Sequence, residues 1–125
     1  MISGTHAIIF ADDPAKARAF FRDVLAYPFV DAHDGWLIFQ LPPAELGIHP
    51  SGAVDEPTSG PPSGRHELYL MCDNVEDTVT DLKAKGVEFT TDIESQGFGL
   101  MVRLRDPGAG EIGLYQPRHP TALDL

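Results

Sequence analysis

The sequence EIGLYQP at residues 111–117 has a close counterpart, ELGIHP, at residues 45–50. Both stretches read as β-strands with a glycine near the centre, and these glycines, Gly47 and Gly113, lie 66 positions apart (113 − 47 = 66). Glycine weakens the interior of a strand, and there it usually marks a bulge or the close approach of a ligand or another backbone. The pair of stretches therefore predicts a duplicated structural unit and raises the question of what the two glycines do.

The same order of elements precedes each stretch. In the first half, residues 5–11 (THAIIFA) predict a strand, and Asp13 followed by Pro14 predicts the start of a helix. Strands around Phe29, at residues 35–41 and at residues 44–50 complete a β-α-β-β-β order. In the second half, a strand at 66–72, a helix from Asn74 to Gly86 and strands at 87–93, 98–105 and 111–117 repeat it.

These halves define the predicted organisation of the chain. Residues 1–125 form a single domain with a first module at 1–50, a flexible linker at 51–64, a second module at 65–117 and a tail at 118–125. The linker is predicted because SGAVDEPTSGPPSG is rich in Pro, Gly and Ser. Each module is too small to bury a sheet alone, so the two should share a core.

Charge and composition exclude several classes of function. The formal net charge is −10, from 9 Lys and Arg against 19 Asp and Glu. Such an excess of acid predicts no binding to nucleic acid or to an anionic membrane. No run reaches the roughly 18 apolar residues that span a bilayer. A single cysteine, Cys72, and the absence of a secretory pattern in the first residues predict a cytoplasmic location.

Three stretches resemble the vicinal oxygen chelate superfamily, which includes glyoxalase I, extradiol dioxygenases, fosfomycin-resistance enzymes and bleomycin-binding proteins. They are HAIIFADDPAKARAFFRDVLAYPF (6–29), CDNVEDTVTDLKAKGVEF (72–89) and DPGAGEIGLYQP (106–117). The resemblance implies an α+β fold in which two βαβββ modules form a curved, mixed-sheet half-barrel, with helices outside and a concave cleft inside. It also implies pairing of modules within or between chains, so a homodimer is expected.

In metal-dependent members of this superfamily, the first and last strands of each module carry the metal ligands. The resemblance transfers these four places to His6, Gly47, Glu67 and Gly113. Catalytic zinc generally has three protein ligands, and non-haem iron often has two His and one carboxylate. His6 and Glu67 supply only two, so a third would have to come from Glu45, Glu111 or His66. A divalent metal therefore stays an open alternative, and no cofactor is assigned.

Strand alternation predicts which side chains line the cleft, because residues two apart share one face of a strand. With Trp36 at the rim, the predicted ligand-binding residues are His6, Ile8, Phe10, Trp36, His49, Glu67, Tyr69, Met71 and Tyr115. A mostly apolar lining with a few polar groups is typical of small-molecule pockets.

Three functions follow as alternatives. The preferred one is a protein that binds a small aromatic or cationic molecule in its cleft without a complete metal site. The second is a metal-dependent lyase, isomerase or dioxygenase that uses His6 and Glu67. The third is a metal-free enzyme in which His6 and Glu67 act as the base and a tyrosine acts as the acid. Whether the chain is an enzyme is left open by the sequence.

Overall fold

Residues 69–117 form a complete β-α-β-β-β unit in the computed structural model, which describes residues 6–52 and 60–124. Its elements are β3 (Tyr69–Met71), α2 (Val75–Ala84), β4 (Glu94–Gln96), β5 (Gly99–Asp106) and β6 (Gly110–Pro117). The strands form one mixed sheet in the order β3-β6-β5-β4, with β3 parallel to β6 and the other neighbours antiparallel.

Helix α2 begins and ends where the sequence predicts. The side chain of Asn74 accepts a hydrogen bond from the backbone N–H of Asp77 at 3.0 Å, which satisfies one of the free donors of the first turn. The chain leaves the helix through Gly86, whose φ of +85° favours glycine. Val75, Val79 and Leu82 are buried, as their spacing predicts.

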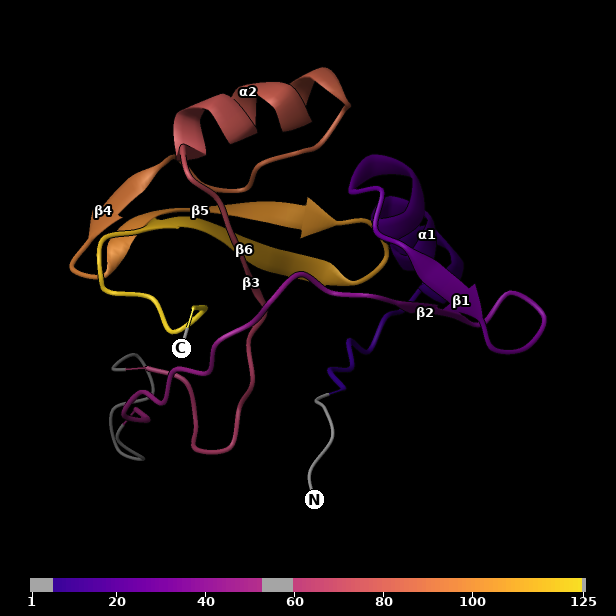
Figure 1. Cartoon of the computed structure of the whole chain (residues 1–125), viewed down its shortest axis with the longest axis horizontal. Coiled ribbons are helices and arrows are strands. Elements are labelled where there is room, and N and C mark those ends of the chain that lie inside the picture. Colours follow the sequence, from indigo (N-terminus) through magenta and orange to yellow (C-terminus); the bar gives the residue numbers. More distant parts are fainter. Residues whose placement is uncertain (1–5, 53–59, 125) are drawn as a thin grey trace.

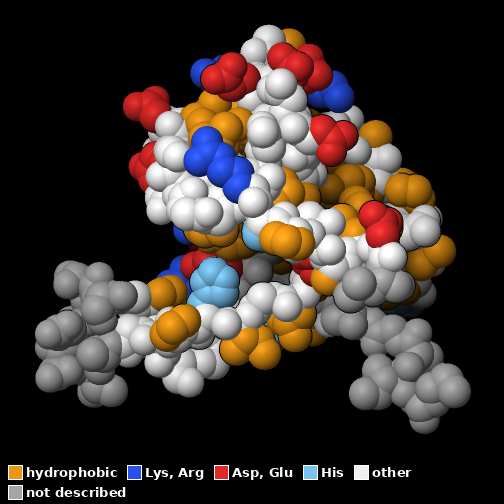
Figure 2. All heavy atoms as spheres, turned by 60° about the vertical axis from the view of Figure 1, so that its left-hand side comes forward, with side chains coloured by type: hydrophobic (Ala, Val, Ile, Leu, Met, Phe, Trp, Pro, Cys, Tyr) orange, Lys and Arg blue, Asp and Glu red, His pale blue; other side chains and the backbone are white. Residues whose placement is uncertain are grey.

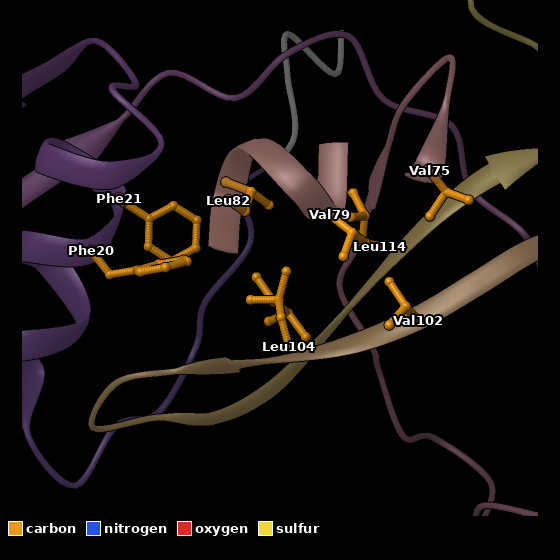
Figure 3. Close-up of a cluster of buried hydrophobic side chains, with 9 residues drawn as sticks. Phe20, Phe21, Val75, Val79, Leu82, Val102, Leu104 and Leu114 are labelled. Carbon is orange, nitrogen blue, oxygen red and sulfur yellow. The ribbon is translucent and has the colours of Figure 1, made fainter. Parts of the chain in front are cut away.

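The hydrophobic core lies between α2 and one face of the four-stranded sheet. Alternate residues of β5 and β6 point into it, with Val102, Leu104, Ile112 and Leu114 at most 4% exposed. Phe20 and Phe21, from the first half of the chain, join the same cluster (Figure 3). Each fully buried aliphatic or aromatic side chain stabilises the fold by about 1.5–3 kcal/mol, so this face of the sheet holds the two halves together.

The first half of the chain forms fewer elements than the second. Asp13 caps α1 (Pro14–Ala19) by accepting from the N–H of Lys16, and the helix continues as a π-helical turn, η1 (Phe20–Val24). Strands β1 (Phe29–Asp31) and β2 (Leu37–Phe39) then pair antiparallel as a separate two-stranded sheet.

Two predicted strands of the first half are absent from the part of the chain that the structure describes. Residues 6–11 and 44–50 have no regular secondary structure. A strand needs a neighbour to accept and donate its backbone hydrogen bonds, and among the described residues neither segment is paired with a neighbouring strand. Their absence is the main difference between the two halves.

One strand of the second half is displaced from its predicted place. Residues 87–93 contribute only a bridge between Phe89 and Leu104, and regular pairing with β5 resumes in β4. The hydroxyl group of Thr91 accepts the hydrogen bond of the Arg103 N–H at 3.0 Å, so a side chain takes the place of a backbone carbonyl in the ladder. The ladder is interrupted there.

The architecture is α+β, with open sheets and helices on the outside, as expected. Figure 1 shows α2 above the four-stranded sheet, whereas residues 40–52 and the C-terminal tail run below it. Of the predicted linker, residues 53–59 lie outside the described residues; its ends are joined by a hydrogen bond from the N–H of Gly52 to the carbonyl of Pro61 at 2.8 Å. Within residues 6–52 and 60–124, no helix is long and apolar enough to cross a membrane.

Candidate functional site

The face of the sheet opposite α2, called the open face below, carries two rows of side chains across neighbouring strands. The pairing of β3, β6 and β5 places Tyr69, Gly113 and Arg103 in one row. The next row consists of Met71, Tyr115 and Met101. Because alternate residues share a face, these are the residues that do not point into the core.

Gly113 lies under the ring of Tyr69. A Cβ atom at residue 113 would overlap the Cδ1 and Cε1 atoms of that ring, so only glycine fits there with Tyr69 in this position. The side chain of Arg103 reaches across from the other neighbouring strand, and its Nη2 donates to the Tyr69 hydroxyl group at 3.2 Å. The missing side chain of Gly113 therefore lets an aromatic ring and a guanidinium group meet over the central strand.

Gly47, the counterpart of Gly113, has no such role. The closest atom to a Cβ there would be Nε2 of His49, at an ordinary contact distance of 3.5 Å. The two glycines are thus similar in sequence but differ in what surrounds them.

The hydroxyl group of Tyr69 bridges two charged side chains. It donates to Oε2 of Glu67 at 2.9 Å while it accepts from Arg103. The other carboxylate oxygen of Glu67 lies 3.4 Å from Nη2 of Arg65. Burial raises the pKa of Tyr69, and the hydrogen bond to Glu67 raises it further, whereas the charge of Arg103 opposes the rise.

The hydroxyl group of Tyr115 lies in a second polar cluster. It donates to Oε1 of Glu45 at 3.3 Å and lies 3.4 Å from Nε2 of His119. The other oxygen of Glu45 accepts from the backbone N–H of Ala122 at 2.8 Å, and its side chain is only 15% exposed. Burial raises the pKa of Tyr115, and the nearby Glu45 adds to the effect. The C-terminal tail thereby holds Glu45 against the sheet.

Both tyrosines therefore stay protonated near neutral pH. Their hydroxyl groups can donate hydrogen bonds to a ligand, but they do not supply a phenolate base. The rings of Tyr69 and Tyr115 stand nearly perpendicular, at 86° with centroids 5.8 Å apart, and Phe98 makes a similar edge contact with Tyr115 at 5.7 Å. The open face combines an aromatic wall with hydrogen-bond donors.

The structure brings some of the predicted site residues together and leaves others apart. Glu67, Tyr69, Met71 and Tyr115 share the open face. The side chains of His6, Ile8, Phe10 and His49 are exposed in segments without regular structure. Trp36, 62% exposed, lies in the turn between β1 and β2, where the guanidinium group of Arg18 sits 4.8 Å from its ring centroid.

The side chains of the described residues do not form a binding site for a divalent metal ion. Among residues 6–52 and 60–124, no group of three His, Cys, Asp or Glu side chains could hold such an ion. Glu67 is engaged by Tyr69 and Arg65, and no hydrogen bond or ion pair in the described structure joins it to His6. His66 and Glu111, two of the substitute ligands, are exposed, and Glu45 is bound to Tyr115 and the tail.

Sequence reasoning missed Arg103 and His119, and it proposed Glu45 as a substitute metal ligand rather than as a partner of Tyr115. A signal for Arg103 exists, because it stands between the apolar Val102 and Leu104 and must point away from the core that they fill. No pattern in residues 118–124 reveals that this tail packs against Glu45 and Tyr115, since that contact depends on tertiary structure.

Two hollows lie away from the open face. One, of about 260 Å³, lies beside η1 and the end of α2 and includes Phe20, Val24, Lys85 and Arg105 in its lining. The other, of about 480 Å³, lies between α1 and the β1–β2 pair and includes Arg18, Arg22, Phe29 and Asp31. Neither contains the tyrosines of the open face.

A βαβββ unit with one face of its sheet covered by a helix and the other face open and aromatic places the protein in the α+β class. The model of the Glyoxalase/Bleomycin resistance protein/Dioxygenase superfamily matches residues 5–112, most of the chain, and the chain belongs to this superfamily. No curated protein matches the sequence.

Several solved structures share the fold. Lactoylglutathione lyase from Agrobacterium tumefaciens is 19% identical, with a TM-score of 0.61, and the match covers 91% of this chain and 92% of that one. A member of the same superfamily from Sphaerobacter thermophilus DSM 20745 is 21% identical, with a TM-score of 0.61 and coverage of 92% and 98%. TnmS3, an antibiotic binding protein from Streptomyces sp. CB03234, is 24% identical, with a TM-score of 0.52 and coverage of 94% and 99%.

Proposed function

We propose that this protein binds a planar aromatic small molecule on the open face and that it does so without a metal ion. The observation that carries the proposal is the row Tyr69, Gly113 and Arg103. At Gly113, where metal-dependent relatives are expected to carry a ligand, the chain has no side chain, and an aromatic ring occupies the space. The row therefore favours stacking and hydrogen bonding over metal coordination.

The neighbouring side chains suit the same ligand. Tyr69, Tyr115 and Phe98 present ring edges and faces at angles to one another, an arrangement that accepts another aromatic ring in stacked or edge contact. Such aromatic pairs contribute about 0.5–1.5 kcal/mol each beyond the area that they bury. Met71 and Met101 flank Tyr115, and their unbranched thioether chains adapt to the outline of a ligand.

Local charge favours an aromatic ligand with an acceptor or an anionic group over a cationic one. The net charge of −10 attracts cations to the protein as a whole. At the open face, however, Arg103 supplies donors at the centre, and the carboxylate of Glu67 is already engaged by Tyr69 and Arg65. The guanidinium group is well suited to pairing with a carboxylate.

Among proteins of this fold, TnmS3 is described as an antibiotic binding protein. Antibiotic binding is therefore a function that a protein of this fold has elsewhere. The ligand class proposed here rests on the side chains of the open face rather than on that likeness.

The experiment is a calorimetric titration of chelator-treated protein with two probes of opposite charge, 2-naphthoate and 2-naphthylmethylamine. We expect 2-naphthoate to bind at least about tenfold more tightly, a difference of about 1.4 kcal/mol. EDTA should leave its affinity unchanged. Affinity that is lost in EDTA and restored by Zn²⁺ or Mn²⁺ would overturn the proposal.

Matched variants locate the binding. Tyr69→Leu and Arg103→Met should each weaken binding of 2-naphthoate at least about tenfold. Phe29→Leu and Arg105→Met are the controls, because Phe29 is an exposed aromatic residue of β1 and Arg105 lies on the same strand as Arg103, paired with Glu88. Equal loss in variants and controls would place the ligand elsewhere.

A further inference from the structure

The smaller hollow, of about 260 Å³, lies where the two halves of the chain meet, beside η1 and the end of α2. The first half contributes Phe20 and Val24 to its lining, and the second half contributes residues 85–88, Arg105 and Pro107. Figure 1 shows the end of α2 next to the segment that contains α1 and η1. The hollow shares no lining residue with the two rows of the open face, so it is a separate place on the molecule.

Backbone geometry forms the wall of the hollow at the end of α2. The N–H of Lys85 donates to the carbonyl of Leu82 at 3.0 Å, and the chain then reverses at Gly86, whose φ is +85°. A Cβ atom at Gly86 would have nothing within 4 Å, so no neighbouring side chain fills that space. Two residues later, the carbonyl of Glu88 accepts from the N–H of Arg105 at 2.9 Å. Backbone hydrogen bonds therefore hold this wall in place.

The deeper part of the hollow is apolar. Phe20 is 4% exposed, and Val24 and Val87 are partly buried and pack against the core cluster. Small-molecule pockets with such a lining usually have volumes of about 300 Å³ or more. At about 30 Å³ for a group the size of a water molecule, 260 Å³ holds roughly eight or nine such groups. A methylene group is of similar size, so the hollow has room for an alkyl chain of about six to eight carbons.

One charged side chain of the lining has no partner of opposite charge. Glu88 and Arg105 form an ion pair at 3.2 Å, so their charges offset each other. Asp23, on the neighbouring η1, is held by Arg22 at 2.7 Å. In the part of the chain that the structure describes, Lys85 is exposed and no carboxylate forms an ion pair with it. Its ammonium group is therefore free to bind an anionic group at the hollow.

The charge of the whole protein opposes an anion, so the groups that a ligand can contact decide the matter. Figure 2 shows acidic side chains scattered over the visible face rather than gathered in one place. At physiological ionic strength, exposed charges are largely screened beyond about 8 Å. Asp106 lies between two lining residues, but it is fully buried and is not part of the lining. Lys85 is the unpaired charge within reach of a ligand.

We propose that this hollow binds a short aliphatic carboxylate, whose alkyl chain covers Phe20, Val24 and Val87 and whose carboxylate group pairs with Lys85. Each methylene group that leaves water should strengthen binding about fourfold. The lysine stem is long and flexible, so its ammonium group can follow the carboxylate at the mouth of the hollow. This second site does not depend on the function proposed for the open face.

Thermal unfolding and calorimetry with sodium octanoate test the site. A ligand that binds only the folded protein raises the melting temperature. At tenfold excess over its dissociation constant, octanoate should raise it by about 5 °C. Hexanoate, which is two methylene groups shorter, should bind about sixteenfold more weakly. The absence of saturable octanoate binding up to about 20 mM would overturn the inference, as would equal affinity for the two carboxylates.

A matched pair of lysine variants locates the carboxylate. Lys85→Met should raise the dissociation constant of octanoate at least about fivefold, because it removes the cation and keeps an unbranched side chain. Lys83→Met is the control, since Lys83 lies on the same helix, with its Nζ atom 5.9 Å from the ring centroid of Phe89, and does not line the hollow. An equal loss in both variants would indicate a general effect of charge and would overturn the inference.

A comparison of the two sites separates this inference from the proposed function. Lys85→Met should leave the affinity for 2-naphthoate unchanged, and Tyr69→Leu should leave that for octanoate within about twofold, because the two places share no residue. Octanoate binding that is lost in Tyr69→Leu would place octanoate on the open face and overturn the inference. Failure of 2-naphthoate to bind, with octanoate still dependent on Lys85, would overturn only the proposed function.

Discussion

The ring of Tyr69 lies against the backbone of Gly113, its direct partner on the neighbouring strand. Because a Cβ atom at residue 113 would overlap the ring, Tyr69 can keep this position only if residue 113 is glycine. The pair is therefore a single structural unit at the centre of the open face, and substitutions at the two positions should not act independently.

Gly113→Ala should lower the free energy of unfolding by about 1–3 kcal/mol, because the new Cβ atom forces the Tyr69 ring away from its contacts. Tyr69→Ala alone removes the ring and its hydrogen bonds to Glu67 and Arg103. In the double variant, the cost of Gly113→Ala should largely disappear. Urea unfolding of the four proteins measures this coupling.

Gly97→Ala provides the control for this cycle, because nothing lies within 4 Å of a Cβ atom at that glycine. It should change stability by no more than about 0.5 kcal/mol. Strictly additive effects of Gly113→Ala and Tyr69→Ala would show that the ring and the glycine are not in contact in solution.

Asp106 should make the stability of the protein depend on pH. Its side chain is fully buried, neither carboxylate oxygen has a hydrogen-bond partner in the described structure, and burial raises its pKa to about 6. The unfolded chain releases this proton near pH 4, whereas the folded chain retains it until about pH 6. The contribution of Asp106 to the free energy of unfolding therefore falls as pH rises from about 4 to 6 and is constant above that range.

Asp106→Asn should abolish this part of the pH dependence and raise the free energy of unfolding at pH 8 by up to about 3 kcal/mol. Unfolding by urea at pH 4, 6 and 8 measures the difference from the parent protein. Asp92→Asn, at an exposed position, is the control and should follow the parent curve. A loss of stability at pH 8 in Asp106→Asn would mean that the carboxylate has a stabilising partner.

Ala26→Gly should stabilise the protein by about 0.5–1 kcal/mol. Ala26 follows η1 with a φ of +57°, a left-handed conformation that is unfavourable for a residue with a Cβ atom and favourable for glycine. Ala15→Gly, inside α1, should have the opposite effect and cost about 0.5–1 kcal/mol. Thermal unfolding of both variants tests the sign; a decrease in both would contradict the assigned backbone conformation.

Divalent metals should have little effect on stability. A ligand that binds only the folded protein raises its melting temperature, and the described residues contain no group of three donors that could hold such an ion. We therefore expect Zn²⁺, Mn²⁺ or Ni²⁺ in tenfold excess to change the melting temperature by less than about 2 °C relative to EDTA. A saturable increase that disappears in His6→Ala would support the metal-dependent alternative instead.

Much of the fold follows from local patterns. Asn74 and Asp13 cap the helices that their positions predict, and the 3.6-residue spacing of Val75, Val79 and Leu82 identifies the buried face of α2. These features depend only on residues that are close together along the chain, so they can be predicted from one sequence. Strand alternation also predicts which face of the sheet each residue of β3 and β6 lies on, and it places Tyr69 and Tyr115 on the same face as Gly113.

The remainder depends on contacts between distant segments. That Tyr69 fills the space over Gly113 could not be predicted, because strand alternation gives the face of a residue but not the direction of its ring. The positions of Glu45 and His119 depend on how two irregular segments cross the sheet, for which the sequence has no periodic signal. The composition of residues 5–11 and 44–50 predicts strands, but composition does not say whether a segment has a pairing partner in the same chain.

The hydrogen bond between Gly52 and Pro61 has a practical consequence. This hydrogen bond holds Gly52 and Pro61 next to each other, so the two residues that flank the segment 53–60 are neighbours in space. The entropy of closing a chain between fixed ends grows only with the logarithm of its length, about 0.6 kcal/mol for each doubling. A peptide tag or a reporter domain whose own termini are close together could therefore be inserted there at low thermodynamic cost, leaving the sheet and its open face available for assay.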